Sequence, residues 1–279
     1  MESIHTPVAP VPTPAPYLGG KRVLARRVIA RIEAIQHRTY AEPFIGMGGV
    51  FFRRRFKPPL EVINDISGDV STLFRVLQRH HQAFMDMLRW QLPTRPDFER
   101  LISLDADRLT DLERAARFFY LQRLTYAGKV RGRSFGVQPG QPAAFDIHAL
   151  AGRLADIHAR LAGVVIERLP YARMIETYDR PDTLFYLDPP YFGGEADYGK
   201  GVFSREDFAR LAEILRKLRG RFLLSINDTP EIRAVFDGFH IEEVRLAYTA
   251  PKGAAKAARE LIVADAPPEG VGAGQGALL

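Results

Sequence analysis

The chain has 279 residues, which is enough for one large domain or two unequal ones. Hydrophobic residues make up 46% and cysteine is absent, so a soluble globular protein is expected, and a disulfide framework and a thiolate metal site are excluded. No apolar run approaches the length of a membrane span, and the formal net charge of +6 suits a polyanionic partner.

Proline and glycine are concentrated at the two ends of the chain. Residues 1–16, MESIHTPVAPVPTPAP, are expected to form a disordered or extended lead-in, and they lack the basic-then-apolar pattern of a signal peptide. Residues 267–279 are expected to form a flexible tail. The lack of cysteine and of a signal pattern favours a cytoplasmic location.

Strand and helix signals alternate after the lead-in. Apolar residues recur at helical spacing from Val23 to Ile32. Residues 39–52, TYAEPFIGMGGVFF, are expected to form a short strand, a glycine-rich turn and then a helix. A buried strand over 60–66 and a helix over 67–90 follow. This alternation predicts a parallel sheet with crossover helices.

The pattern changes over residues 81–163, where amphipathic helices dominate. Helices are predicted over 109–126 and 145–161. The residues between them, 127–142, are rich in Gly, Arg and Pro, and we expect an exposed hairpin or loop. A mainly helical segment is therefore predicted as an insert in an α/β domain.

The α/β pattern resumes after the helical segment. Ser204 and Asp207 stand at capping-box spacing at the start of a helix that is expected to end at Gly220. Strands are predicted over residues 164–169, 183–187, 221–227, 242–248 and 260–265.

A glycine-rich turn and a later acid indicate a nucleotide-like ligand. Gly46, Gly48 and Gly49 follow a strand directly, so a ligand can approach the backbone there. Asp65 stands 19 positions after Gly46 at the end of the next strand, where an acid accepts hydrogen bonds from ribose hydroxyls. The dinucleotide fingerprint requires glycine at position 51, where this chain has Phe51, which disfavours NAD. S-adenosylmethionine, which has a ribose and an adenine but no pyrophosphate, fits better.

The segment TLFYLDPPY, residues 183–191, ends a buried strand with an acid, two prolines and a tyrosine. Proline fixes φ and cannot donate to a ladder, so Asp188 to Tyr191 should be stiff and extended. Ligands bind at the carboxyl ends of strands in open α/β sheets, which favours a binding site there. The alternative is a rigid strand-to-loop turn without a chemical role.

These motifs together resemble the Dam-like DNA adenine-N6 methyltransferases of phages and prophages. YLGGK, EPFIGMGGVFF, NDI and LDPPY occur in that family's order, and the resemblance covers most of residues 17–265. It implies a Rossmann-like methyltransferase sheet with an inserted, mainly helical target-recognition domain. The S-adenosylmethionine-binding catalytic domain would comprise residues 17–80 and 164–266, and the insert residues 81–163.

The resemblance implies site residues by position. Asp65 would bind the ribose hydroxyls and Ile66 would pack on the adenine ring of the cofactor. Family members often carry an acid followed by an aromatic residue before the catalytic strand, whereas this chain has Pro170 and Tyr171, so their role stays unassigned. The implied cofactor-binding residues are Tyr17, Lys21, Phe44, Gly46, Gly48, Gly49, Asp65, Ile66 and Asp188. The implied catalytic residues are Asp188, Pro189, Pro190 and Tyr191.

The expected chemistry activates the exocyclic amine of adenine. The Asp188 carboxylate and the Pro189 carbonyl would accept hydrogen bonds from that amine and draw out its lone pair. The target base must be flipped out of the duplex, and Tyr191 would offer an aromatic face. No metal is expected, because the leaving group is already activated by its positive charge. Without a thiol, methylation of the cytosine ring carbon is excluded, whereas methylation of the cytosine amine stays open.

The arginine-bearing loop resembles the family's DNA-contacting hairpin. Lys129, Arg131 and Arg133 alternate, so they are expected to project from one face of a strand and contact DNA. A solvated basic loop is the alternative. The nearby run from Arg53 to Arg55 is expected to form a solvated helix face or to contact phosphate.

The resemblance also implies partners and leaves two other functions open. Double-stranded DNA is the expected partner, and the enzyme is expected to be a monomer that does not bind a membrane. It would act in a bacterial or phage-infected cell. A separate restriction endonuclease is a further possible partner. One alternative is a methyltransferase that acts on RNA adenine or a protein glutamine, although such enzymes usually carry Asn at the position of Asp188. The other is a catalytically inactive DNA-binding relic.

Overall fold

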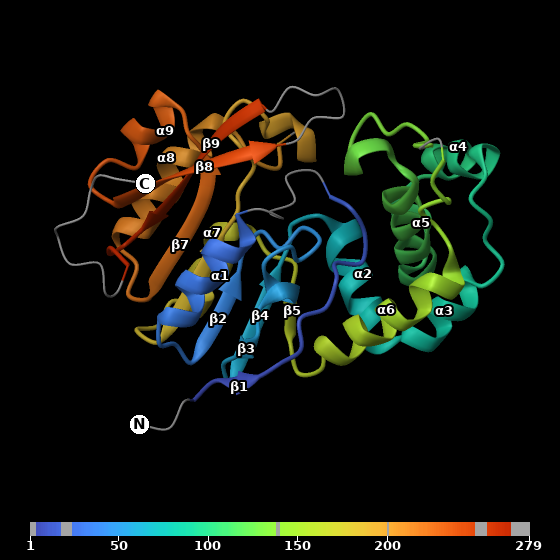
Figure 1. Cartoon of the computed structure of the whole chain (residues 1–279), viewed down its shortest axis with the longest axis horizontal. Coiled ribbons are helices and arrows are strands. Elements are labelled where there is room, and N and C mark those ends of the chain that lie inside the picture. Colours follow the sequence, from blue (N-terminus) through green and yellow to red (C-terminus); the bar gives the residue numbers. More distant parts are fainter. Residues whose placement is uncertain (1–3, 18–23, 138–139, 200, 249–255, 269–279) are drawn as a thin grey trace.

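The computed structural model describes residues 4–17, 24–137, 140–199, 201–248 and 256–268, and within them it contains a seven-stranded sheet (Figure 1). The strand order is β5-β4-β2-β6-β7-β9-β8. Neighbouring strands are parallel except at β9, which is antiparallel to β7 and β8. The strands are β2 (Thr39–Glu42), β4 (Leu60–Asn64), β5 (Val165–Glu167), β6 (Thr183–Leu187), β7 (Arg221–Asn227), β8 (His240–Tyr248) and β9 (Lys256–Ala264). This order confirms the predicted Rossmann-like α/β fold, and it reverses direction between β2 and β6, where such sheets bind ligands.

Each face of the sheet carries its own hydrophobic core, because successive strand side chains point to opposite faces. In β6, Leu184 and Tyr186 belong to one core, whereas Phe185 and Leu187 belong to the other. Helices α1 (Ala25–Ala34) and α2 (Gly68–Arg79) contribute to the first core. Helices α7 (Tyr171–Tyr178), α8 (Arg205–Arg216) and α9 (Pro230–Val235) contribute to the second. Both faces of the parallel strands are therefore buried, as their continuous apolar sequences require.

Helices α3 to α6 form a group beside the sheet, to its right in Figure 1. They are α3 (His81–Leu88), α4 (Arg95–Ser103), α5 (Asp111–Leu124) and α6 (Ile147–Arg160). The helix predicted over residues 67–90 is interrupted at His80, whose φ of −129° and ψ of 31° are not helical. The interruption separates α2 from α3.

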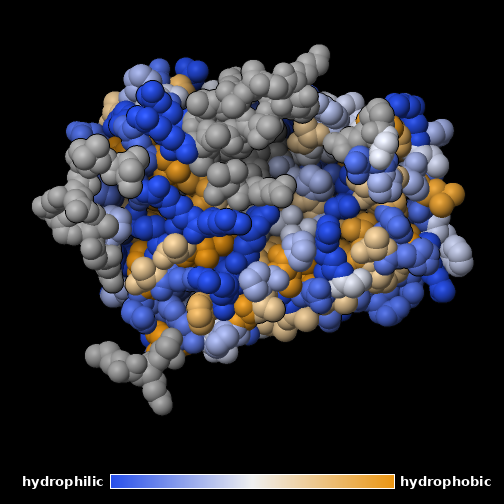
Figure 2. Space-filling model, viewed as in Figure 1, coloured by the Kyte–Doolittle hydropathy of each residue, from blue (hydrophilic) through white to orange (hydrophobic). Residues whose placement is uncertain are grey.

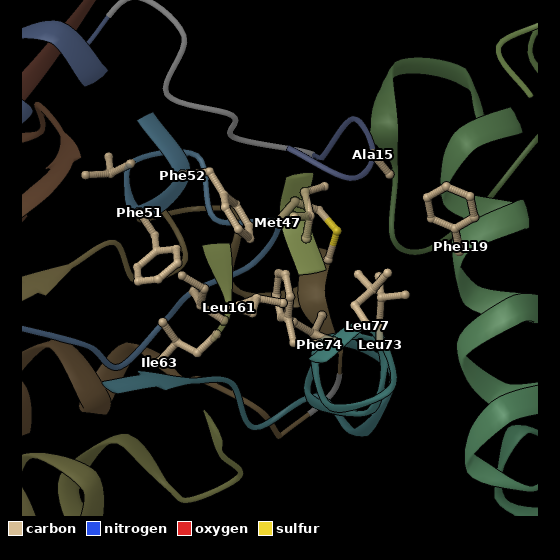
Figure 3. Packing of buried hydrophobic residues seen from close by; sticks show 14 of the residues in the cluster. Ala15, Met47, Phe51, Phe52, Ile63, Leu73, Phe74, Leu77, Phe119 and Leu161 are labelled. Carbon is tan, nitrogen blue, oxygen red and sulfur yellow. The ribbon is translucent and has the colours of Figure 1, made fainter. Parts of the chain in front are cut away.

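The group of helices shares a core with the sheet. Figure 3 shows side chains from the glycine turn, α2 and α5 that belong to this core, among them Met47, Leu73 and Phe119. All three are almost completely buried. Because the two parts share closely packed apolar side chains, contacts between α5 and α2 resist a shift of α5.

Residues 4–17 form an ordered, extended strap, so of the two states expected for the lead-in, disordered or extended, its described residues have the extended one. Strand β1 (Thr6–Pro7) pairs antiparallel with β3 (Phe56–Lys57), and the Val11 amide donates to the Phe52 carbonyl at 2.8 Å. Proline-rich chain is extended already, and the amides between its prolines remain free to donate. Of the expected flexible tail, residues 269–279 lie outside the described residues.

The residues after the glycine turn differ from the prediction in two ways. The expected helix is only a 3-10 turn, Phe51–Arg53. Arg54, expected to be solvated, is 1% exposed and ion-paired with Glu61 of β4. Glu61 also accepts hydrogen bonds from Arg160 of α6 at 2.6 and 2.7 Å. Sequence periodicity missed this burial because the partner of Arg54, Glu61, lies in β4 and is itself paired with Arg160 of α6.

The surface seen in Figure 2 is mostly hydrophilic, with smaller hydrophobic areas between the polar residues. In the part of the chain that the structure describes, no helix is both long and apolar enough to cross a membrane.

Candidate active site

A cavity of about 720 Å³ opens at the carboxyl ends of β2, β4 and β6. It lies at the point where the strand order reverses. The strap, the segment before α7, helix α8 and one residue of the loop after α5 complete its wall. Eight of the residues expected to bind cofactor or catalyse line it: Tyr17, Phe44, Gly46, Gly49, Asp65, Ile66, Asp188 and Pro190.

The glycine turn brings backbone close to the cavity. Gly46 has a φ of +50°, and a Cβ there would lie 3.0 Å from the ring of Tyr17. Gly48 has a φ of +72°, and a Cβ there would clash with the ring of Phe52. Gly48 does not line the cavity. Both positions need glycine, since an L side chain is strained at such φ values. Gly46 therefore admits Tyr17 to the site, whereas Gly48 shapes the turn.

Asp65 follows β4 and faces the glycine turn. Its Oδ2 accepts a hydrogen bond from the Gly46 amide at 3.0 Å, and its Oδ1 accepts one from the Ser67 amide at 2.9 Å. Desolvation raises the pKa of Asp65 to about 6, although both amide contacts oppose the rise. Each carboxylate oxygen keeps a second lone pair, so the side chain can still accept hydrogen bonds from ligand hydroxyls.

Asp188 lies directly after β6, at the end of five buried residues. Its Oδ1 accepts a hydrogen bond from the Ser225 hydroxyl of β7 at 3.0 Å. The Tyr186 and Ser225 hydroxyl oxygens are 2.8 Å apart, so two hydrogen-bonded hydroxyls lead to the carboxylate. Pro190 lines the cavity, whereas Pro189 is buried outside its lining. The stiff segment thus presents an oriented acid to the cavity.

Tyr191 ends the same segment but does not line the cavity. Its side chain packs against the core that contains α8 and is hydrogen-bonded to Glu260 of β9. Burial and the nearby carboxylates of Asp188 and Glu260 raise the pKa of its hydroxyl well above the usual value. The ring is therefore neutral and fixed in place.

Glu42 is a cavity residue that the sequence reasoning missed. It ends β2, is 2% exposed, and accepts a hydrogen bond from the Tyr40 hydroxyl at 2.5 Å. Burial raises its pKa to about 8. An acid at the end of a buried strand, directly before a glycine turn, was the signal that could have identified it.

The pair Pro170 and Tyr171, unassigned from the sequence, forms another part of the wall. The Tyr171 hydroxyl donates to Oδ1 of Asp207 at 2.8 Å, and its ring centroid lies 5.5 Å from that of Phe44. Asp207 also caps α8, as predicted, because Oδ2 accepts from the Ser204 amide at 2.8 Å. These contacts join α7, α8 and the glycine-turn side of the cavity.

The loop after α5 is not the expected strand. Its β-pairing is limited to one isolated antiparallel bridge between Thr125 and Phe135. Lys129 and Arg131 are exposed, whereas Arg133 turns inward and donates from Nη2 to Oε1 of Gln122 at 3.1 Å. The three basic side chains therefore do not share one face, since the backbone lacks the alternation of a strand. Lys21, the remaining expected cofactor residue, lies outside the described residues.

Comparisons with known proteins identify the family to which this chain is similar. A family model described as D12 class N6 adenine-specific DNA methyltransferase matches residues 17–250. The type II methyltransferase M.CviBI of Paramecium bursaria Chlorella virus NC1A is 24% identical over 214 residues, which cover 75% of this chain and 81% of that protein.

Two further relatives carry adenine methylation in their names. The DNA adenine methylase of Vibrio cholerae is 25% identical over 259 residues, covering 86% of this chain and 90% of that protein. The DNA N-6-adenine-methyltransferase of Escherichia phage P1 is 27% identical over 226 residues, covering 72% of this chain and 28% of that protein. Since the family match spans most of the sequence, this chain belongs to the D12 class N6 adenine-specific DNA methyltransferases.

Proposed function

We propose that this enzyme transfers a methyl group from S-adenosylmethionine to the exocyclic N6 amine of adenine in duplex DNA, at a specific site and after flipping the target base. The observation that carries the proposal is the position of Asp188. Asp188 lines a cavity of about 720 Å³ that the Gly46 turn and Asp65 line as well. A carboxylate for the amine and a subsite for the ribose therefore share one cavity.

The cofactor subsite is proposed to extend from the strap to the end of β4. Tyr17 and Phe44 would pack on apolar parts of the cofactor, and Asp65 would accept hydrogen bonds from its ribose hydroxyls. Ile66 is 38% exposed on the cavity wall, so its side chain is accessible to the adenine ring. Lys21 is proposed to belong to the same subsite, and Gly48 to support it through the turn.

The catalytic residues are proposed to act as fixed hydrogen-bond acceptors. S-adenosylmethionine supplies a methyl group on a positively charged sulfur, which leaves as the neutral thioether. Asp188, held by Ser225, would accept one amine hydrogen, so that the nitrogen lone pair points at the methyl carbon. The Pro189 carbonyl is the second acceptor proposed from the sequence, although Pro189 itself lies outside the cavity lining. The N–C bond would form as the C–S bond breaks, and the proton that the methylated amine then loses would pass to the Asp188 carboxylate and from there to solvent. Acceptors that need no reorientation lower the barrier to this step.

DNA binding is proposed to involve the loop after α5. Lys129 and Arg131 are exposed and fit contacts to phosphates or base edges, whereas the Arg133 guanidinium is held by Gln122. The role of Tyr191 as a stacking surface for the flipped base is proposed from the family resemblance alone, since its ring lies outside the cavity lining. The basic sequence pI of about 9.6 supports a polyanionic substrate.

The partners of the enzyme are proposed from its relatives. One of them, M.CviBI, is named a type II methyltransferase, which supports pairing with a separate restriction endonuclease. We propose that the enzyme is a monomer, since each strand can be methylated in a separate event. We also propose that it is located where cellular or phage DNA is.

The test is methyl transfer from labelled S-adenosylmethionine to unmethylated duplex DNA, followed by digestion to nucleosides. We expect the label in N6-methyladenine, and none in RNA or protein offered in parallel. Label in N4-methylcytosine would contradict the choice of base. Label only in RNA or protein would contradict the choice of substrate, and binding of cofactor and DNA without transfer would support an inactive relic.

A further inference from the structure

Gln122 joins three segments of the chain with one buried side chain. It lies in α5 and is 0% exposed. Its Nε2 donates to the carbonyl of Pro16 in the strap and to the carbonyl of Gly128 in the loop, both at 2.8 Å. Its Oε1 accepts from Nη2 of Arg133 at 3.1 Å. Both polar atoms of the amide are thus engaged, and the three contacts connect the strap and the loop after α5 to this helix.

Two of these segments reach the cavity. Pro16 precedes Tyr17, and both residues line it. The loop of residues 126–137 contains Gly128 and Arg133, and its Val130 also lines the cavity. The cavity wall is therefore built partly from the same loop that exposes Lys129 and Arg131.

Gly128 packs the loop directly on the strap. Its φ is +67°, and a Cβ at this position would lie 2.9 Å from the Tyr17 amide nitrogen. Contact this close means that the backbone of the loop and the backbone of Tyr17 cannot shift independently. The Gln122 amide fixes both sides of this contact, because it binds the carbonyls of Pro16 and Gly128 together.

We propose that Gln122 is a positioning residue that couples DNA binding at the loop of residues 126–137 to cofactor binding at Tyr17. This inference rests on the proposed function, in which that loop contacts DNA and Tyr17 contacts S-adenosylmethionine. DNA that holds the loop also holds Tyr17 through Gln122, so the cofactor then binds a segment that is already ordered. By linkage, the cofactor strengthens DNA binding by the same factor.

The geometry explains why one residue carries the coupling. A buried amide that lost either segment would leave a donor or acceptor without a partner, which is costly. The loop and the strap therefore move together or not at all. Substitution of a residue that stabilised only α5 would change the amount of folded protein. It would leave unchanged the effect of DNA on the affinity for the cofactor.

The experiment compares wild type with Gln122→Met, which keeps the volume of the side chain and removes its hydrogen bonds. Binding of S-adenosylhomocysteine is measured by calorimetry with and without unmethylated duplex DNA. The matched control is Tyr120→Phe in the same helix, which removes a buried hydrogen bond of 2.7 Å to the Leu92 carbonyl, away from the cavity. Gln122→Asn, whose amide is too short to reach both carbonyls, replaces Gln122→Met if the latter does not fold.

We expect DNA to tighten S-adenosylhomocysteine binding about 5-fold or more in wild type and Tyr120→Phe, and to have almost no effect in Gln122→Met. The same DNA effect in Gln122→Met as in wild type would overturn the inference, and so would no effect in wild type. A wild type that binds S-adenosylhomocysteine or DNA not at all would overturn the proposed function itself, and the inference with it.

Discussion

The backbone amide of Gly46 donates a 3.0 Å hydrogen bond to Oδ2 of Asp65 and so joins the turn after β2 to the end of β4. The Ser67 amide binds the other carboxylate oxygen, which orients the side chain. Since β2 and β4 are parallel neighbours, their carboxyl ends meet at one edge of the sheet. One acid thereby fixes the turn and faces the cavity.

Gly46→Ala should weaken cofactor binding. The new Cβ would lie 3.0 Å from the Tyr17 ring at a φ of +50°, so the turn or the ring must shift. We expect S-adenosylhomocysteine to bind about tenfold more weakly, measured by calorimetry. The backbone strain alone should destabilise the protein by about 1–2 kcal/mol.

The control for this variant is Gly163→Ala. Gly163 has a φ of +77° and nothing within 4 Å of its missing Cβ, so the substitution introduces similar strain without a steric clash. We expect a similar loss of stability and unchanged S-adenosylhomocysteine affinity. Equal loss of affinity in both variants would show that strain, and not the contact with Tyr17, is responsible.

The free energy of unfolding of Glu42→Gln, relative to that of wild type, should increase as the pH rises. Burial raises the pKa of Glu42 to about 8 in the folded protein, so the folded state holds its proton more tightly than the unfolded chain does. The stability that this group contributes is complete below its unfolded pKa and is lost as the pH rises through the folded pKa. Glutamine does not titrate and keeps the Tyr40 hydroxyl paired.

Urea unfolding of wild type and Glu42→Gln at about pH 5 and about pH 8 measures this effect. The difference in the free energy of unfolding should grow in favour of the variant by at most about 1.4 kcal/mol per pH unit. A difference that is the same at both pH values would mean that Glu42 is ionised throughout this range.

Glu61→Gln should strongly destabilise the fold. It would leave Arg54 and Arg160, which are 1% and 7% exposed, without a compensating charge. Removing one member of a buried ion-pair network typically costs about 3–5 kcal/mol. Glu176→Gln breaks the exposed pair with Arg173 and should leave stability nearly unchanged, so comparable unfolding midpoints for the two variants would argue against the buried network.

The sequence predicted those parts of the site that are local in the chain. The apolar residues of β4 and β6 end at Asp65 and Asp188, and the glycines follow β2, so each motif could be placed at a strand end from its own neighbours. Parallel pairing then brings these ends together. The fold class followed from the same alternation of strand and helix.

Long-range contacts account for most of what the sequence did not predict. Burial of Arg54 depends on the carboxylate of Glu61 in β4, which also binds Arg160 of α6, and the inward turn of Arg133 depends on Gln122 of α5. The strap is ordered by pairing between β1 and β3, although proline-rich composition favours disorder. Local propensity and periodicity contain no information on such partners.

The central claim, that Asp188 activates the adenine amine, is tested most directly by single-turnover methyl transfer with Asp188→Ala. The control is Asp237→Ala, an exposed carboxylate in the turn after α9 and outside the cavity. We predict that Asp188→Ala lowers the transfer rate by at least about 10²-fold while S-adenosylhomocysteine still binds, and that Asp237→Ala matches wild type. An Asp188→Ala enzyme that methylates adenine at the wild-type rate would contradict the account.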